Sequence, residues 1–229
     1  LTMSDNDPIR TDAVIIANSR DAQQFSQTAA LPLKTIRGQI TLIESSTELS
    51  PLKTVVCHQG YITPAINNWH SVGATFDNND CSTELRVKDH QRNLYNLQQA
   101  IPSIGSPINK TNPSTLMGRA GLRCTSPDYL PLVGPVNDRQ KFLLDYAPLR
   151  NNSHHKMAIT GSYHPNLYIN VAHGSRGLTS IPLCSELLAS LINNEPAPLP
   201  RALCQALNPA RFTIRELLRN NSPNKSYSH

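Results

Sequence analysis

The sequence has no apolar run long enough to span a membrane, and it does not open with a basic segment followed by an apolar one. We therefore expect neither membrane insertion nor secretion. Charged residues are scarce, at 16%, while hydrophobic residues make up 38%. A disordered chain would carry more charge and less apolar weight, so this composition predicts a soluble globular protein. Its 229 residues are enough for one large or two modest domains.

The cysteines show no Cys-x-x-Cys spacing and are odd in number, being Cys57, Cys81, Cys124, Cys184 and Cys204. Single, scattered cysteines favour reduced and mostly buried thiols in a cytoplasmic protein over disulfides or a zinc site. We therefore expect no metal in this protein.

The charge balance is mildly basic, with a formal net charge of +5 and a pI near 9.0. Such a balance permits an anionic partner such as RNA but does not require one. Three arginines, Arg211, Arg215 and Arg219, lie in a segment with a helical pattern near the C-terminus. They fit either phosphate contacts or an ordinary solvated face.

A glycine-rich turn at residues 172–182 is the most informative stretch. Residues 166–171 are apolar and β-prone, and leucines at helical spacing begin at Leu183, so the pattern predicts a strand, a turn and a helix. The start of such a helix presents unpaired N–H groups and partial positive charge, which suit a phosphate, a carboxylate or an electron-rich ring edge. An ordinary strand-to-helix corner explains the same pattern.

Residues 12–18 form an apolar run that ends in small and polar residues, which is typical of a buried parallel strand. Ligands in open α/β sheets lie beyond the carboxyl ends of such strands, so Ala17 is a candidate ligand contact. A core strand with no ligand is equally compatible. The rest of the chain predicts an antiparallel meander and several helices. The expected strands are 31–43, 54–57, 61–65 and 70–76, and the expected helices are 88–100, 202–207 and 212–218.

Five segments resemble, in the same order, FAD-dependent oxidases of the D-amino-acid oxidase and glycine oxidase type. They are Ile15-Ile16-Ala17-Asn18, Leu31-Pro32-Leu33 with Arg37-Gly38-Gln39, Gly60-Tyr61-Ile62-Thr63-Pro64, Gly121-Leu122-Arg123-Cys124 with Asp128, Leu130-Pro131 and Gly134, and Gly174-Ser175-Arg176-Gly177-Leu178 with Pro182-Leu183-Cys184. The resemblance extends to the oxidoreductase half of bifunctional tRNA-modifying proteins, which share the Gly-Ser-Arg-Gly-Leu turn and a segment like Leu207-Asn208-Pro209-Ala210-Arg211.

This resemblance implies an α/β (α+β) fold, in which part of a Rossmann-like FAD domain is joined to an antiparallel-sheet substrate domain. It assigns residues 1–36 to the FAD-binding domain, 37–165 to the substrate-binding domain, 166–195 to a return into the FAD-binding domain, and 196–229 to C-terminal helices and a tail. The implied reaction is FAD-dependent oxidative removal of the carboxymethyl group from a carboxymethylaminomethyl uridine at the wobble position of tRNA, which leaves the aminomethyl form.

The resemblance also implies site residues. A substrate that ends in a carboxylate calls for a bidentate planar cation, and Arg123 matches the position of the family's carboxylate-binding arginine. For Arg123 the alternative is a structural ion pair. Tyr61 resembles the aromatic hydroxyl that lies near the substrate. Cofactor contacts are expected from Ala17, Arg37, Gly38, Gly174, Ser175, Arg176, Gly177, Leu178 and Thr179.

The chain departs from the family in two places. None of its ten glycines forms the Gly-x-Gly-x-x-Gly fingerprint that holds the nucleotide part of FAD. We therefore expect a fragment whose FAD site is incomplete, and whose parent also carries a methyltransferase domain. Ser19 stands where relatives usually keep a glycine. Two other functions stay open: a flavin oxidase of glycine or another small amine, and a non-catalytic RNA-binding fragment.

Overall fold

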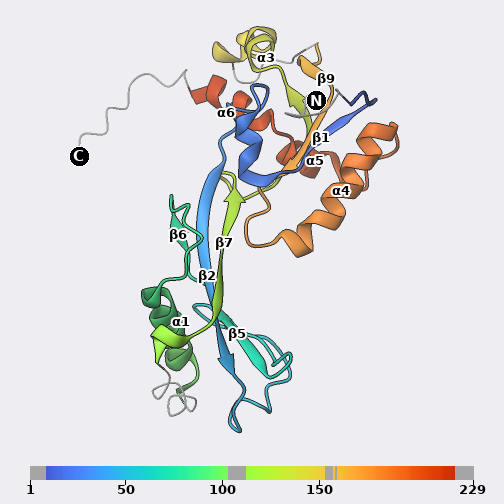
Figure 1. The fold of residues 1–229 in the computed structure, drawn as a ribbon. Helices are drawn as coiled ribbons and strands as arrows, with labels where there is room; N and C mark the ends of the chain where they lie inside the picture. The colour runs from blue at the N-terminus through green and yellow to red at the C-terminus, as the bar shows by residue number, and fades with distance from the viewer. Residues whose placement is uncertain (1–8, 103–111, 153–156, 158, 220–229) are drawn as a thin grey trace, which may run out of the picture. The chain divides into compact units, whose positions relative to one another are not determined.

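The computed structural model describes residues 9–102, 112–152, 157 and 159–219, and it divides the chain into two compact units (Figure 1). Unit 1 combines both ends of the chain, Leu1–Lys34 and Cys124–His229. Unit 2 is the middle, Thr35–Arg123. The division therefore falls at Arg123 and not at residue 165, because β8 (Leu132–Asn137) pairs with β9 (Tyr163–Val171) inside unit 1. The assignment of the units to cofactor and substrate stays a prediction.

Unit 1 is built on a three-stranded sheet in the order β1-β9-β8, with β1 at Val14–Ile16. β1 runs parallel to β9, as the sequence predicts, and β8 runs antiparallel to it. The helices of this unit are η1 (Ser19–Gln24), α3 (Arg139–Asp145), η4 (Ala147–Arg150), α4 (Gly177–Asn193), α5 (Arg201–Leu207) and α6 (Arg211–Arg219).

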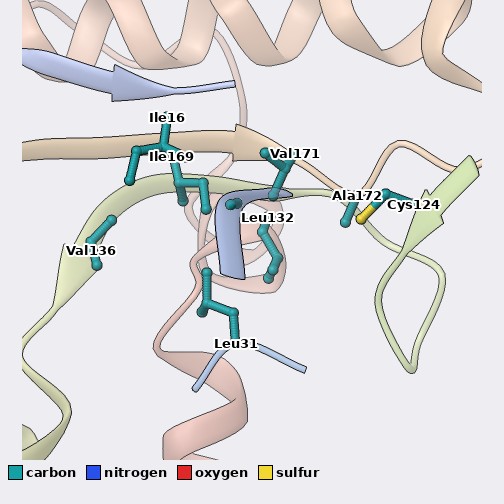
Figure 2. Packing of buried hydrophobic residues seen from close by; sticks show 9 residues of the cluster. Ile16, Leu31, Cys124, Leu132, Val136, Ile169, Val171 and Ala172 are labelled. Carbon is teal, nitrogen blue, oxygen red and sulfur yellow. The ribbon is translucent and has the colours of Figure 1, made fainter. Parts of the chain in front are cut away.

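Each face of this sheet has its own core. Leu132 and Val133 are consecutive in β8, so their side chains lie on opposite faces. Leu132 belongs to a cluster with Ile16, Ile169 and Val171 from the other two strands (Figure 2). Val133 packs instead against the buried side of α4, whose core residues are Cys184, Leu187 and Leu188.

Unit 2 is a six-stranded sheet that carries one long helix. Its strands are β2 (Lys34–Glu44), β3 (Val56–Cys57), β4 (Tyr61–Ile62), β5 (Trp69–Gly73), β6 (Asp77–Asn78) and β7 (Gly118–Thr125), whose last two residues belong to unit 1. The order is β3-β4-β5-β2-β6, with β7 also paired to β2. The pairs β3–β4, β4–β5 and β2–β5 are antiparallel, which confirms the predicted meander. The helix is α1 (Val87–Ala100), and a short turn of 3₁₀ helix, η3 (Pro113–Thr115), precedes β7.

The sheet face that meets α1 is sealed by a buried polar network. Arg37 pairs with Asp89 of α1 and donates to Gln39. Asn93 of α1 donates to the carbonyl of Gln39 and to the hydroxyl of Thr41. Buried polar groups are stable only when they are paired, and these pairs fix α1 on one face of β2. Gly38 and Ile40, which alternate with these residues in β2, lie on the opposite face.

Three sequence expectations need correction. The helix after the glycine-rich turn begins at Gly177, before the leucine pattern that begins at Leu183 and one residue from the start at Leu178 that the family resemblance implies, because Pro182 is accommodated early in the helix. No element was expected for residues 118–145, yet they form β7, β8 and α3. Their glycines and Pro135 interrupt the alternation by which a strand is recognised. The expectation of mostly buried thiols is wrong for Cys57 and Cys81, which are exposed.

Candidate functional site

In unit 1, the carboxyl ends of β1 and β9 meet at one edge of the sheet. Ile16 pairs with Ile169 in parallel register, so the residues that follow the two strands leave in the same direction. The backbone N–H of Gly174 donates to the carbonyl of Cys124 at 2.8 Å. Burial raises the pKa of the Cys124 thiol, while a hydrogen bond with Ser19 opposes that rise. The structure thus gathers the Ala17–Ser19 turn and the glycine-rich turn around Cys124.

The glycine-rich turn leaves backbone donors unpaired at the start of α4. Gly174 has φ +58°, a conformation that favours glycine, and α4 begins soon after it. The N-cap residue, Arg176, makes no side-chain capping bond. Within the part of the chain that the structure describes, the N–H groups of Gly177 and Leu178 have no acceptor. They are the donors that a helix start offers to an anionic or electron-rich group.

The side chains of this turn are largely solvent-exposed. Leu178 is 97% exposed, and Ser175, Arg176 and Thr179 are exposed as well. The Thr179 hydroxyl donates to the carbonyl of Arg176 at 2.9 Å, so the unpaired donors that the turn offers to a cofactor are backbone groups. Sequence analysis did not single out His173, which supports the turn. Its ring nitrogens lie 2.9 Å from the hydroxyl of Ser180 and 2.8 Å from the amide oxygen of Asn170, and burial lowers its pKa.

The backbone conformation at Ser19 is one that glycine adopts more easily than serine. Ser19 adopts φ +62°, where glycine is strain-free and serine is not. The backbone at this turn therefore has a conformation that favours glycine.

In unit 2, Arg123 lies over Gly38. A methyl group on Gly38 would be 1.9 Å from Nη1 of Arg123 and 2.4 Å from its central guanidinium carbon, so the guanidinium rests on bare backbone. Nη1 of Arg123 donates to the carbonyl of Thr75 at 3.3 Å. Among the described residues, no carboxylate lies within ion-pair distance of Arg123. The structural ion pair, which was the alternative role for this arginine, is not formed.

Tyr61 belongs to the same group of residues. Burial lowers the pKa of the Arg123 guanidinium, and the neighbouring Tyr61 phenol acts in the opposite direction. Desolvation of an arginine without an acidic partner is costly, and an incoming carboxylate would remove that cost. Gly38, Tyr61 and Arg123 are therefore brought together in unit 2.

Arg37, which is next to Gly38, behaves differently. Its buried guanidinium donates to Asp89, to Gln39 and to the carbonyls of Ser82 and Glu84. Four of its five donors are used within the protein, so only its backbone is available for a cofactor. The predicted site residues thus fall into two groups, one in each unit, and each group is described by itself.

A cavity of about 410 Å³ in unit 1 contains none of the predicted site residues. It is lined by residues that include Leu31, Asn137, Phe212 and Arg219. In the part of the chain that the structure covers, no three His, Cys, Asp or Glu side chains are gathered as a metal site requires. No helix there has the length and apolar character needed to cross a bilayer.

The arginines of α6 are mostly engaged within unit 1. Arg211 is 7% exposed, and it donates to both carboxylate oxygens of Asp128. Arg215 donates to the same carboxylate at 2.5 Å. Only Arg219 of the three has no ion-pair partner among the residues that the structure describes. Phosphate contacts by the whole set are therefore disfavoured.

Comparison with known proteins gives consistent matches. The family model described as FAD dependent oxidoreductase matches residues 2–191. The tRNA 5-methylaminomethyl-2-thiouridine biosynthesis bifunctional protein MnmC of Pseudomonas syringae pv. tomato is 45% identical over 208 residues, which cover 90% of this chain and 32% of that protein. The protein of the same name from Legionella pneumophila (strain Corby) is 43% identical over 210 residues, covering 92% and 31%. The chain spans about a third of the length of these curated relatives.

Solved structures show the same fold. Glycine oxidase from Geobacillus kaustophilus superposes with a TM-score of 0.62 at 18% identity, covering 87% of this chain and 45% of that one. Iminodiacetate oxidase from Chelativorans sp. BNC1 gives a TM-score of 0.56 at 22% identity, covering 86% and 46%. At these identities the likeness concerns the fold alone.

Proposed function

The chain belongs to the FAD dependent oxidoreductase family, and from this premise we propose that it is part of an enzyme that removes the carboxymethyl group from a carboxymethylaminomethyl uridine of tRNA. Relatives at 38–45% identity are named as tRNA 5-methylaminomethyl-2-thiouridine biosynthesis proteins, which supports the tRNA substrate. A cytoplasmic location, where tRNA is available, accompanies this proposal.

The residues present fit one part of FAD. The unpaired N–H groups of Gly177 and Leu178 and the left-handed Gly174 suit the electron-rich edge of the flavin ring. The nucleotide part has no counterpart, because the sequence contains no Gly-x-Gly-x-x-Gly. Bound FAD would supply the two-electron acceptor that amine oxidation requires.

Arg123 carries the proposal. Its guanidinium is half-buried, has no carboxylate partner among the described residues, and lies beside Tyr61. A half-buried guanidinium without a carboxylate partner is suited to a substrate carboxylate, which it would bind through two parallel charge-assisted hydrogen bonds. Binding at that end fixes the carbon between carboxylate and amine, which is the carbon to be oxidised. The Tyr61 hydroxyl would serve as a second donor to the carboxylate.

The overall reaction balances with water as the second reactant. The amine R–NH–CH2–COO⁻ loses two electrons and two protons to form an imine, and the imine adds water. The products are R–NH2 and glyoxylate. The residues of this chain supply binding and orientation, which reduce the entropic part of the barrier.

The test uses a chimera, in which this chain replaces the matching 208 residues of the Pseudomonas syringae relative. The chimera, with FAD, is incubated with tRNA that carries the carboxymethylaminomethyl nucleoside. We expect mass spectrometry to show the aminomethyl nucleoside, and an aldehyde assay to show glyoxylate. If the nucleoside persists while glycine or another small amine is oxidised, the small-amine function replaces this one. If the chimera binds tRNA without holding flavin, the non-catalytic function is correct.

Replacing Arg123 with Leu in this chimera should chiefly raise KM. The expected loss in kcat/KM is about 3 kcal/mol, the cost of removing one partner from a desolvated charge pair. Steady-state kinetics measure it, and Arg119→Leu on the same strand is the matched control, because Arg119 is an exposed residue. A loss of flavin without a change in KM would assign Arg123 to the cofactor.

A further inference from the structure

Phe76 is an aromatic side chain that the fold leaves open beside Arg123. It lies between β5 and β6, and its side chain is 50% exposed. The centre of its ring is 6.0 Å from the guanidinium carbon of Arg123. That distance is at the outer limit of cation–π attraction, so the pair by itself contributes little. Neither core packing nor the cation explains why a ring is held at this position.

The strand register places Phe76 on the ligand face of the sheet. Arg37 pairs with Asp77, and the N–H of Thr75 donates to the carbonyl of Gln39, so Phe76 lies opposite Gly38. Residues opposite each other in a sheet point to the same face. The face at Gly38 is the one that the Arg123 guanidinium covers. Phe76 and Arg123 therefore border the same opening.

Tyr61 lies on that face too. It pairs with Gly73 of β5, and the β2–β5 register places Gly73 opposite Ile40. A methyl group on Gly73 would lie 3.0 Å from the side chain of Ile40, which confirms that these residues point the same way. Ile40 and Gly38 are two apart in β2 and so share a face. This face carries a phenol, a guanidinium and an exposed ring, whereas the other face is sealed by α1.

We propose that Phe76 is a specificity-determining residue that stacks on the pyrimidine base of the substrate nucleotide while Arg123 holds its carboxylate. This inference rests on the proposed function and adds the means by which the base is recognised. Four bonds of about 1.5 Å each separate the carboxyl carbon from the ring carbon that bears the side chain, so the base lies a few ångströms from the bound carboxylate. An aromatic face at this range is what RNA-modifying sites use to hold an unstacked base.

If Phe76 stacks on the base, its loss should weaken only ligands that carry a base; if Phe76 merely packs against the protein, it should not discriminate between ligands. Two probes separate binding of the base from binding of the carboxylate. They are the nucleoside 5-carboxymethylaminomethyluridine, and N-ethylglycine, which has the same amine and carboxylate but no base. Binding of each to the full 229-residue chain is followed by NMR titration. We expect Phe76→Leu to weaken nucleoside binding about tenfold, the loss typical of one base–aromatic stack, and to leave N-ethylglycine binding unchanged. Phe76→Tyr, which keeps an aromatic face, should retain the affinity.

Two further variants complete the experiment. Tyr95→Leu, at an aromatic residue of α1 that is 61% exposed, is the matched control and should change neither affinity. Arg123→Gln should weaken both probes. Equal weakening of both probes by Phe76→Leu, or no weakening of either, would overturn the stacking role and leave the carboxylate site standing. Failure of both probes to bind the wild-type chain would overturn the carboxylate site and the stacking role together.

Discussion

At the scale of single residues, Arg37 and Gly38 show what a sequence motif leaves undecided. Both belong to the Arg-Gly-Gln segment, and both were expected near the flavin ring. The side chain of Arg37 is directed to α1 and buried in a polar network, whereas Gly38 faces the opposite side under Arg123. Because side chains alternate along a strand, Arg37 and Gly38 must lie on opposite faces of the sheet. The sequence does not show which face is covered by α1, because Asp89 and Gln39 contact Arg37 only in the folded chain.

Gly38→Ala should separate ligand binding from stability. The atoms nearest to the new methyl group would be those at the far end of the Arg123 side chain, at 1.9–2.4 Å, and that end can move aside at little cost. We expect the free energy of unfolding to change by less than about 1 kcal/mol, while the affinity for N-ethylglycine falls about tenfold as the guanidinium is displaced. Urea unfolding and the NMR titration measure the two effects.

Gly118→Ala provides the contrast on the neighbouring strand. Its methyl group would lie 2.3 Å from the backbone carbonyl oxygen of Ile40, which cannot move aside alone. This variant should lose about 1–3 kcal/mol of stability.

An unchanged affinity for N-ethylglycine in Gly38→Ala would show that Arg123 does not act from the position over Gly38.

At the scale of elements, α6 shows how a correct helix prediction can misassign a helix surface. The helix was expected at residues 212–218 and forms at Arg211–Arg219. Its arginines looked alike in the sequence, but Arg211 is buried against Asp128, and Arg215 shares that carboxylate. The partner lies more than 80 residues away, in the turn after β7. A single sequence contains no signal that couples positions so far apart.

Asp128→Asn should destabilise unit 1 and change its response to acid. Burial alone would raise the pKa of Asp128, but hydrogen bonds from Arg211, Arg215 and Ser126 outweigh it and hold the pKa well below its ordinary value. A carboxyl group whose pKa is lowered by folding contributes stability above its unfolded pKa of about 3.9. That contribution is lost as the pH falls through the folded pKa.

We therefore expect Asp128→Asn to cost about 3 kcal/mol at neutral pH, because it leaves Arg211 buried without its partner. Below about pH 5 the wild-type chain should lose stability more steeply than the variant. Urea unfolding at a series of pH values measures both curves. Asp21→Asn, which removes a half-exposed pair with Arg20, should cost less than about 1 kcal/mol. Parallel acid curves for wild type and Asp128→Asn would contradict this account.

At the scale of the whole molecule, local patterns predicted the elements better than the boundaries between units. The parallel pairing of the first strand, the antiparallel meander and the three longest helices were predicted from periodicity and turn residues. The first unit boundary, after Lys34, lies close to the one expected after residue 36. The second, after Arg123, was expected after residue 165, and its position depends on the pairing of β8 with β9 across an intervening helix. The site was predicted as a list of residues. Which of them are proposed to act through backbone, as at Gly177, and which through side chain, as at Arg123, depends on burial that no motif encodes.

The absence of the nucleotide-binding fingerprint from this sequence leads to a prediction about how the whole chain binds flavins. In the proposed function the donors at Gly177 and Leu178 bind the flavin ring, whereas the sequence has no glycine-rich fingerprint to bind the pyrophosphate. The ring is common to riboflavin, FMN and FAD, so the chain should bind all three weakly and with dissociation constants within about tenfold of one another, a difference of about 1.4 kcal/mol. Flavin fluorescence anisotropy measures the three affinities. The Pseudomonas syringae chimera, which carries the rest of that relative's chain, is the control and should prefer FAD strongly. A comparable preference for FAD in the isolated chain would mean that its own residues recognise the nucleotide, and the expectation of an incomplete site would then be wrong.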